Sequence, residues 1–322
     1  MRVLSVDGGG YLGLASASFI NEAERHFGKK FYNQFDLFCG TSTGAIIALA
    51  LAAGLDGTAL CELYERFGRD VFWNPFPGCR KLRMVRGAFL SMYGNHNLRK
   101  ALDDTYKGKT LADLCNAKKY VMIPAFCLTN GSPRIFKTDH APEFSCHNQY
   151  LLSDIALASA AAPFYLPLVK IKSPTTNQFE TFCDGGVFAN SPALLGYTEA
   201  IDAFKCAPSE VSVLSLSTPR ENLAEYASSM GWMKRAFNAR GALIWGSRLL
   251  SVFIDGNSMA SHQSLLRVAR AGNTRYERIE FQKPIGLDLD IATDVATTTL
   301  RNLGAAAIQE NSMRERLKPF LN

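Results

Sequence analysis

Short apolar runs alternate with longer amphipathic segments along the first two thirds of the chain. The short runs are rich in Val, Leu, Ile, Phe and Cys, which is typical of buried strands. In the longer segments apolar residues recur every three or four positions, which predicts helices packed on a core. The predicted strands are residues 2–6, 38–40, 120–128, 134–137, 181–183 and 211–217. The predicted helices are about residues 13–26, 45–50, 56–72, 97–106, 110–114, 151–162 and 193–204.

This alternation determines the expected fold class. Strands that alternate with helices predict an α/β protein with a mostly parallel, doubly wound central sheet. Residues 211–217 are the last predicted strand, and from about residue 221 the pattern is helical to the end. Because no repeat or linker divides the chain, we expect one domain over residues 1–322. It would have a catalytic core at about 1–220 and a helical C-terminal portion at about 221–322.

The composition of the 322 residues is ordinary for a globular protein, with 47% hydrophobic and 20% charged residues. A net charge of +6 suits an anionic membrane surface, and no block of like charge predicts a DNA or RNA partner. The eight cysteines are scattered, which predicts reduced thiols in the cytoplasm. The longest apolar run, residues 45–55, is about half of the roughly 20 residues that a membrane span needs. We expect neither a signal peptide nor a membrane span.

The strand at residues 38–40 runs directly into Gly40-Thr41-Ser42-Thr43-Gly44 and an apolar helix. This is the Gly-x-Ser-x-Gly pattern of a nucleophile elbow, in which the serine stands at the tip of a strained strand-to-helix turn. Glycines are needed at positions 40 and 44 because side chains there would collide with the neighbouring strand and helix. The pattern predicts that Ser42 is a nucleophile. The alternative is a glycine-rich turn with a chance serine.

A second glycine-rich turn, Asp7-Gly8-Gly9-Gly10-Tyr11-Leu12-Gly13, follows the first strand and opens a helix. Two functions fit it. Gly8, Gly10 and Gly13 match the Gly-x-Gly-x-x-Gly fingerprint of Rossmann-type dinucleotide binding. Alternatively, the exposed amides form an oxyanion hole for an attacked carbonyl. We favour the oxyanion hole, because the next strand ends in the serine elbow and not in an acidic residue for a ribose.

Ser42 needs a proton acceptor. His262 is the only histidine after Asp184, so a Ser42-Asp184-His262 triad is one candidate, although its helical surroundings differ from the loop that this kind of triad uses. The other candidate for the proton acceptor is Asp184 itself, without a histidine. It ends an apolar strand, where parallel sheets gather their sites, and a partly desolvated carboxylate could act as the base directly. An Asp-Gly pair can also be plain turn chemistry.

The order of three motifs resembles the patatin-like phospholipases: Asp7-Gly8-Gly9-Gly10, then Gly40-Thr41-Ser42-Thr43-Gly44, then Asp184-Gly185-Gly186. Residues 158–163 and 184–192 are also similar to segments of this family, and the resemblance covers roughly residues 1–220. It implies a three-layer α/β/α fold and a Ser42–Asp184 catalytic dyad. It also implies an oxyanion hole from the amides of Gly8, Gly9 and Gly10, and hydrolysis of lipid acyl esters without a metal.

Two positions depart from the family pattern. The family usually carries Arg or Lys where this chain has Leu12, so a charge beside the glycine loop is missing. The family's Gly-Thr-Gly after the last strand is Ser217-Thr218-Pro219 here. Any role of that cation toward an anionic substrate therefore has no counterpart at position 12.

A narrower resemblance connects the chain to bacterial effectors of anti-phage defence. It rests on Tyr11 and Leu12 in the glycine loop, on residues 93–98 and on the helical C-terminal third. Those effectors are switched on by a cyclic oligonucleotide and degrade the host membrane. The resemblance implies a cyclic dinucleotide or trinucleotide activator and peripheral association with the inner membrane, and it is compatible with a homo-oligomer.

Two basic segments are candidates for contacts with lipid or nucleotide. Residues 72–86 mix aromatic side chains with four cations, which is typical of a lid at a lipid–water interface or of a loop whose rings enter the core. The C-terminal cations could form part of a cyclic-nucleotide pocket or a solvated helical face: Lys234, Arg235, Arg240, Arg248, Arg267 and Arg270.

Overall fold

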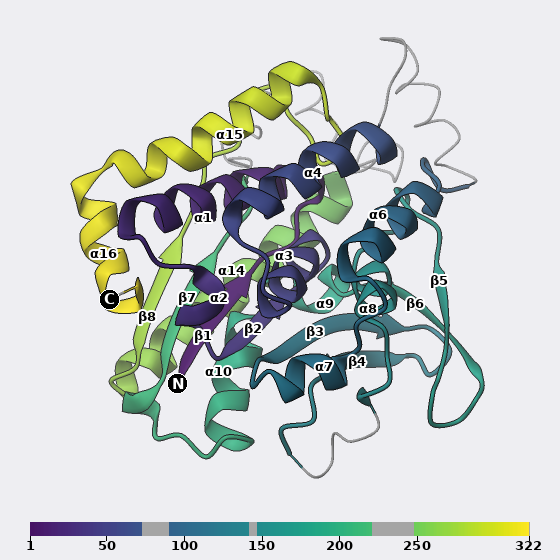
Figure 1. Ribbon diagram of the computed structural model, residues 1–322, viewed down its shortest axis with the longest axis horizontal. Coiled ribbons are helices and arrows are strands. Elements are labelled where there is room, and N and C mark those ends of the chain that lie inside the picture. Colours follow the sequence, from purple (N-terminus) through teal and green to yellow (C-terminus); the bar gives the residue numbers. More distant parts are fainter. Residues whose placement is uncertain (73–89, 142–146, 221–247, 322) are drawn as a thin grey trace, which may run out of the picture.

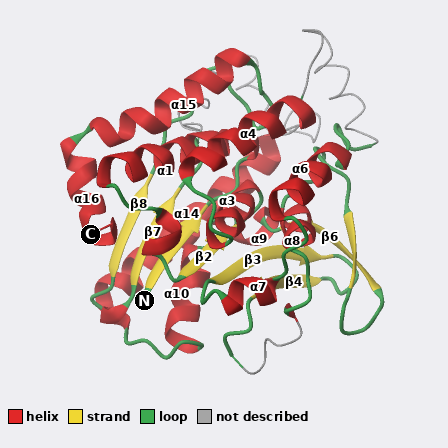
Figure 2. Cartoon of the chain, in the orientation of Figure 1, coloured by secondary structure: helices red, strands yellow, loops and turns green. Residues whose placement is uncertain are grey.

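The computed structural model describes residues 1–72, 90–141, 147–220 and 248–321, and it places a sheet between layers of helices (Figures 1 and 2). The strands are β1 Arg2–Val6, β2 Leu37–Gly40, β3 Tyr120–Cys127, β4 Ser132–Lys137, β5 Val169–Lys172, β6 Phe179–Asp184, β7 Ser212–Leu216 and β8 Arg275–Ile279. The α-helices of the N-terminal half are α1 Gly13–Phe27, α2 Phe31–Gln34, α3 Thr43–Ala52, α4 Gly57–Val71, α6 His96–Tyr106, α7 Leu111–Asn116 and α8 Leu152–Ser159. Those that follow are α9 Gly186–Ala189, α10 Ala193–Asp202, α14 Arg248–Ala271, α15 Asp294–Gln309 and α16 Asn311–Leu321, and the 3-10 helices are η1 Gly10–Leu12 and η3 Pro208–Glu210.

The central sheet has the order β5-β6-β3-β2-β1-β7-β8, and β4 pairs with β3 outside this path. The pairs from β3 through β2, β1 and β7 to β8 are parallel, whereas β4, β5 and β6 join by antiparallel pairing. The predicted α/β class with a mostly parallel sheet is therefore confirmed.

Successive residues of the strands feed two separate cores on opposite faces of the sheet, because side chains alternate along a strand. Leu4 and Phe38 pack in the core that contains α1, α3, α4 and α15. Val3 and Cys39 pack in a second core with residues of α10 and α14. The two cores make the molecule a three-layer α/β/α structure.

The described part of the C-terminal third, residues 248–321, is mostly helical, except for one strand that the pattern did not reveal. Residues 211–217 are not the last strand, because β8 adds to the sheet in parallel beside β7. Three of the five β8 residues are charged, so the segment lacks the apolar signature of a buried strand. One of them, Arg278, is nevertheless buried, and its charge is paired inside the molecule with Asp7.

Helix α15 lies along α1 on the outer side of the molecule (Figure 1). Gly304 permits this close packing, because a Cβ atom there would lie 2.2 Å from the carbonyl oxygen of Ala15. The hydroxyls of Tyr11 and Thr297 share a hydrogen bond of 2.7 Å across the same interface. The C-terminal helices therefore close over the helix that follows the glycine-rich turn.

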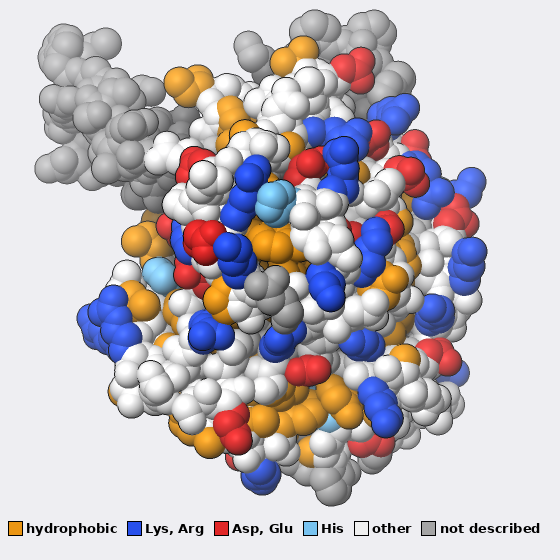
Figure 3. Space-filling view, turned by 60° about the vertical axis from the view of Figure 1, so that its left-hand side comes forward, with side chains coloured by type: hydrophobic (Ala, Val, Ile, Leu, Met, Phe, Trp, Pro, Cys, Tyr) orange, Lys and Arg blue, Asp and Glu red, His pale blue; other side chains and the backbone are white. Residues whose placement is uncertain are grey.

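Lys and Arg side chains are spread among acidic ones on the face that Figure 3 shows, rather than gathered into one patch. Among the residues with a described placement, no helix is long and apolar enough to cross a membrane.

Candidate active site

Strands β2 and β6 lie along the same edge of β3, and their carboxyl ends point toward each other. Strand β2 pairs in parallel with the start of β3, with Cys39 opposite Met122. Strand β6 pairs in antiparallel fashion with its end, with Asp184 opposite Ala125, and β4 occupies the other edge. The expectation that Asp184 ends a strand of the parallel set is wrong. Its strand approaches β2 from the opposite direction and so brings Asp184 toward the turn after Gly40.

The turn after β2 has the geometry of a nucleophile elbow. Ser42 has φ 56° and ψ −124°, a strained conformation for a residue with a side chain. A Cβ atom on Gly40 would lie 2.1 Å from the carbonyl oxygen of Gly44, and one on Gly44 would lie 2.2 Å from that of Val6. The two glycines thus let helix α3 start directly against β1 and β2, with Ser42 at its N-terminus.

Asp184 is buried, and it lines the same cleft as Ser42, whose side chain acts on its pKa. Burial raises the pKa of Asp184 to about 6, and the hydrogen bonds from Ser42 and from the amide of Gly186 oppose this rise. The Gly186 N–H donates to Oδ1 of Asp184 at 2.6 Å, which fixes the carboxylate. A carboxylate with a raised pKa is a stronger base than one in water, so it can accept a hydroxyl proton more readily.

The end of helix α8 holds both Ser42 and Asp184 through the backbone. Ser42 donates its N–H to Oγ of Ser159 at 3.0 Å, and Ser159 in turn donates to the carbonyl of Pro124 at 2.6 Å. Asp184 donates its N–H to the carbonyl of Ala161 at 3.0 Å. The sequence predicted a closely packed helix of small residues over 151–162 and a similarity of 158–163 to the family, but not this function. Only the run of small residues there could have indicated a close approach.

The glycine loop after β1 packs against the nucleophile. A Cβ atom on Gly8 would lie 3.0 Å from Cβ of Ser42. The Gly8 N–H donates to the carbonyl of Asn190 at 3.2 Å, so that amide is already occupied. The N–H groups of Gly9 and Gly10 have no acceptor within the part of the chain that the structure describes. Of the three amides named from the sequence, those two are available to an oxyanion.

Comparison with known proteins gives the family. A family model described as "Patatin-like phospholipase" matches residues 4–196. The chain belongs to the patatin-like phospholipase family. As a member of this family it is a lipid acyl hydrolase. Family membership sets aside the dinucleotide-binding interpretation of Gly8, Gly10 and Gly13. Gly13 instead packs under Tyr64, whose hydroxyl would lie 2.5 Å from a Cβ atom there.

Two relatives span nearly the whole patatin-like chain. A "cGAMP-activated phospholipase" from Pseudomonas aeruginosa is 31% identical over 325 residues, which cover 99% of this chain and 91% of the relative. A protein with the same description from Vibrio cholerae is 31% identical over 334 residues, which cover 96% of this chain and 90% of the relative. Among solved structures, VipD from Legionella pneumophila is 15% identical and covers 99% of this chain and 67% of its own, with a TM-score of 0.47.

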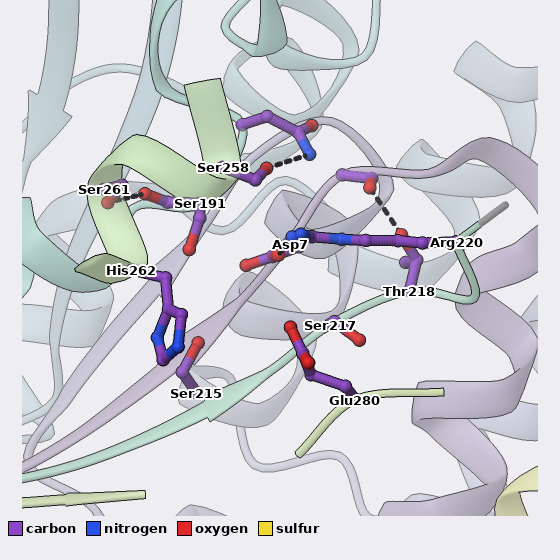
Figure 4. Close-up of polar contacts among 12 residues, drawn as sticks. Asp7, Ser191, Ser215, Ser217, Thr218, Arg220, Ser258, Ser261, His262 and Glu280 are labelled. Carbon is purple, nitrogen blue, oxygen red and sulfur yellow. Dashed lines mark hydrogen bonds and ion pairs between the residues drawn. The ribbon is translucent and has the colours of Figure 1, made fainter. Parts of the chain in front are cut away.

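His262 does not enter the site of this patatin-like phospholipase. It lies on α14 (Figure 4). Its Nδ1 shares a hydrogen bond of 2.8 Å with the hydroxyl of Tyr276. Burial and the charge of Arg278 lower its pKa. It is not among the residues that line the cleft around Ser42. The triad with His262 therefore has no geometric support.

The cleft over Ser42 and Asp184 has an empty volume of about 1100 Å³, part of it open to solvent. One side is apolar and includes Leu12, Phe67 and Leu166. Leu12, at the position where the family usually has a cation, therefore contributes apolar surface to the cleft. Cations still reach it from elsewhere, because Arg220 and Lys283 are also among its lining residues. An apolar wall beside charged groups suits a substrate with both acyl chains and a polar head.

The two basic segments identified in the sequence are only partly visible. The proposed lid at residues 72–86 lies outside the described residues apart from Phe72, which lines the cleft. The side chains of Lys234, Arg235, Arg240 and Arg248 also lie outside them. Arg267 and Arg270 are exposed on α14 and do not line the cleft. Within the described ranges, no group of three or more His, Cys, Asp or Glu side chains could hold a metal ion.

Proposed function

We propose that the protein hydrolyses fatty-acyl esters of membrane glycerophospholipids with a Ser42–Asp184 dyad. One observation carries this proposal: the buried carboxylate of Asp184, with a raised pKa, lines the same cleft as Ser42 at the tip of a strained elbow, and the Ser42 side chain acts on that pKa. Two further features support it: the amides of Gly9 and Gly10 in the adjoining loop have no acceptor among the described residues, and the cleft is mostly apolar.

In the proposed mechanism, Ser42 Oγ attacks the ester carbonyl while Asp184 takes its proton. The negative charge on the carbonyl oxygen is stabilised by the amides of Gly9 and Gly10. When the tetrahedral intermediate collapses, the protonated Asp184 returns its proton to the leaving alkoxide and an acyl-enzyme remains. A water molecule then attacks this ester while Asp184 accepts its proton. Asp184 returns that proton to Ser42 Oγ as the fatty acid leaves.

We further propose that a cyclic dinucleotide activates the enzyme and that it acts as an effector of bacterial antiviral defence that degrades the host membrane. Support comes from the relatives described as cGAMP-activated phospholipases, which align over nearly the full length of this chain. A cyclic trinucleotide is the alternative activator. In this proposal the protein is cytoplasmic, associates with the inner membrane when active, and forms a homo-oligomer.

The test is fatty-acid release from phospholipid vesicles by the wild type, Ser42→Ala and Asp184→Asn, each with and without cGAMP and a panel of cyclic trinucleotides. We expect the wild type to be active and each variant to lose at least about 10³-fold, in line with loss of a nucleophile or its base. Ser153→Ala, on the first turn of α8, is the control. Full activity in either variant would remove that residue from the mechanism, and equal wild-type rates with and without every nucleotide would reject the proposed activation.

A further inference from the structure

The carboxylate of Asp7, directly before the glycine loop, is fully buried between two arginines from the C-terminal part of the chain. Arg278 Nη2 lies 2.6 Å from Asp7 Oδ2 and Arg278 Nη1 lies 3.4 Å from Oδ1. Arg220 Nη2 donates to Oδ2 as well, at 2.7 Å (Figure 4). A buried carboxylate needs such partners, because desolvating an unpaired charge costs several kcal/mol.

Arg278 is itself buried and reaches two more elements. Its Nη1 lies 2.7 Å from the hydroxyl of Ser215 on β7 and 3.5 Å from that of Ser191. Ser191 follows Asn190, whose carbonyl accepts the Gly8 N–H. One guanidinium therefore connects the start of the glycine loop with the segment that follows Asp184.

Asp7 is one of several residues that hold the two ends of the glycine loop. The Asp7 N–H donates to the carbonyl of Leu216 at 2.9 Å, which continues the pairing of β1 with β7. Thr218 Oγ1 donates to the carbonyl of Gly8 at 2.7 Å. The next two amides, those of Gly9 and Gly10, have no acceptor in the described ranges, and the loop around them is held at its far end by the Tyr11 N–H, which donates to the carbonyl of Leu289 at 2.7 Å. Asp7 and Gly8 hold its near end.

We propose that Arg278 is a positioning residue for the oxyanion hole: through Asp7 it holds the glycine loop so that the Gly9 and Gly10 amides face Ser42. The inference rests on the proposed function, and it assigns a role to β8, which lies outside the residues that match the family model. Lysine cannot replace this arginine, because one ammonium group cannot reach Asp7, Ser191 and Ser215 together as a planar guanidinium does.

The experiment compares Arg278→Lys with the wild type on a soluble short-chain ester, with and without cGAMP, so that binding to a membrane does not limit the rate. The control is Arg301→Lys, which changes a more exposed arginine paired with Glu65 at 2.7 Å. We expect Arg278→Lys to lower kcat about 10- to 100-fold, less than the 10²–10³ for losing an oxyanion donor outright. KM should stay within about twofold, and Arg301→Lys should match the wild type.

A second readout separates positioning from folding. A trifluoromethyl ketone ester analogue adds Ser42 Oγ to its carbonyl and mimics the tetrahedral oxyanion, so its affinity should fall by the same factor as kcat. Titration of reactive Ser42 with a fluorophosphonate gives the fraction of folded enzyme. Ser215→Ala, which removes one hydrogen bond to Arg278 and leaves both charges, should show a smaller loss in the same direction.

Three outcomes would overturn the inference. The first is a wild-type kcat in Arg278→Lys. The second is a lower total rate with an unchanged rate per labelled Ser42, because the variant would then only contain less folded enzyme. Unchanged affinity for the ketone despite a lower kcat would also contradict it. If Ser42→Ala keeps wild-type activity, the proposed function fails and the inference fails with it. If Ser42→Ala is inactive, these three outcomes reject the inference alone.

Discussion

Burial of the Asp184 carboxylate costs folding free energy and supplies basicity at the same time. Its pKa is about 6 in the folded protein, against 3.8 for an exposed aspartate. The folded state therefore binds this proton more tightly than the unfolded state does. The free energy of unfolding should consequently fall as the pH rises from about 4 to about 6, and the loss should be complete above that range.

This gives a stability prediction for Asp184→Asn. The variant removes the buried charge, so at pH 7.5 it should unfold with a free energy up to about 3 kcal/mol higher than the wild type. The gain should shrink toward zero below pH 4, where the wild-type carboxyl is protonated. Urea unfolding of both proteins at pH 3.5, 5.5 and 7.5 measures this. A variant that is less stable than the wild type at pH 7.5 would contradict the pKa assignment.

At the scale of elements, local motifs were predictable from the sequence and strand pairing was not. The elbow at Ser42 needs only a short strand, two glycines and a helix, so the local sequence pattern was sufficient to predict it. The direction of β6 depends on which edge and which end of β3 it joins, and nothing in residues 181–183 encodes that. Strand β8 was missed because Arg278 is buried by charge pairing with Asp7, a residue more than 270 positions away.

Helix α8 provides the element-scale prediction. Ser159→Ala leaves the Ser42 N–H and the Pro124 carbonyl without their buried partner, so stability should fall by about 1–3 kcal/mol. Because the elbow loses an anchor, kcat should fall roughly 10-fold with KM nearly unchanged. Steady-state kinetics on a soluble ester and thermal melting measure the two effects. Ser153→Ala on the same helix is the matched control. A Ser159→Ala enzyme with wild-type kcat would show that α8 does not position the nucleophile.

At the scale of the whole molecule, the net charge of +6 is distributed rather than concentrated on the face in Figure 3. Attraction to a membrane would then be a long-range effect of the total charge, which salt screens. The sequence was sufficient to predict this charge and the family. It was not sufficient to predict which amides of the glycine loop are free, because the carbonyl that occupies the Gly8 amide belongs to Asn190.

The corresponding prediction concerns salt and lipid charge. Hydrolysis of vesicles should rise with their fraction of anionic lipid and fall several-fold between 0.05 and about 0.5 M NaCl, as the screening length shortens. Hydrolysis of a soluble ester should stay constant over the same range, which controls for direct effects of salt on the site. Equal rates on neutral and anionic vesicles at low salt would show that the net charge does not recruit the enzyme.

The most direct test of the dyad is the rate at which a fluorophosphonate labels Ser42 as a function of pH, followed by mass spectrometry of the labelled peptide. The wild-type rate should rise with pH and level off above an apparent pKa near 6, because only the ionised Asp184 can accept the serine proton. Asp184→Asn should label at least about 100-fold more slowly, without this step. Labelling of Asp184→Asn at the wild-type rate would contradict the account.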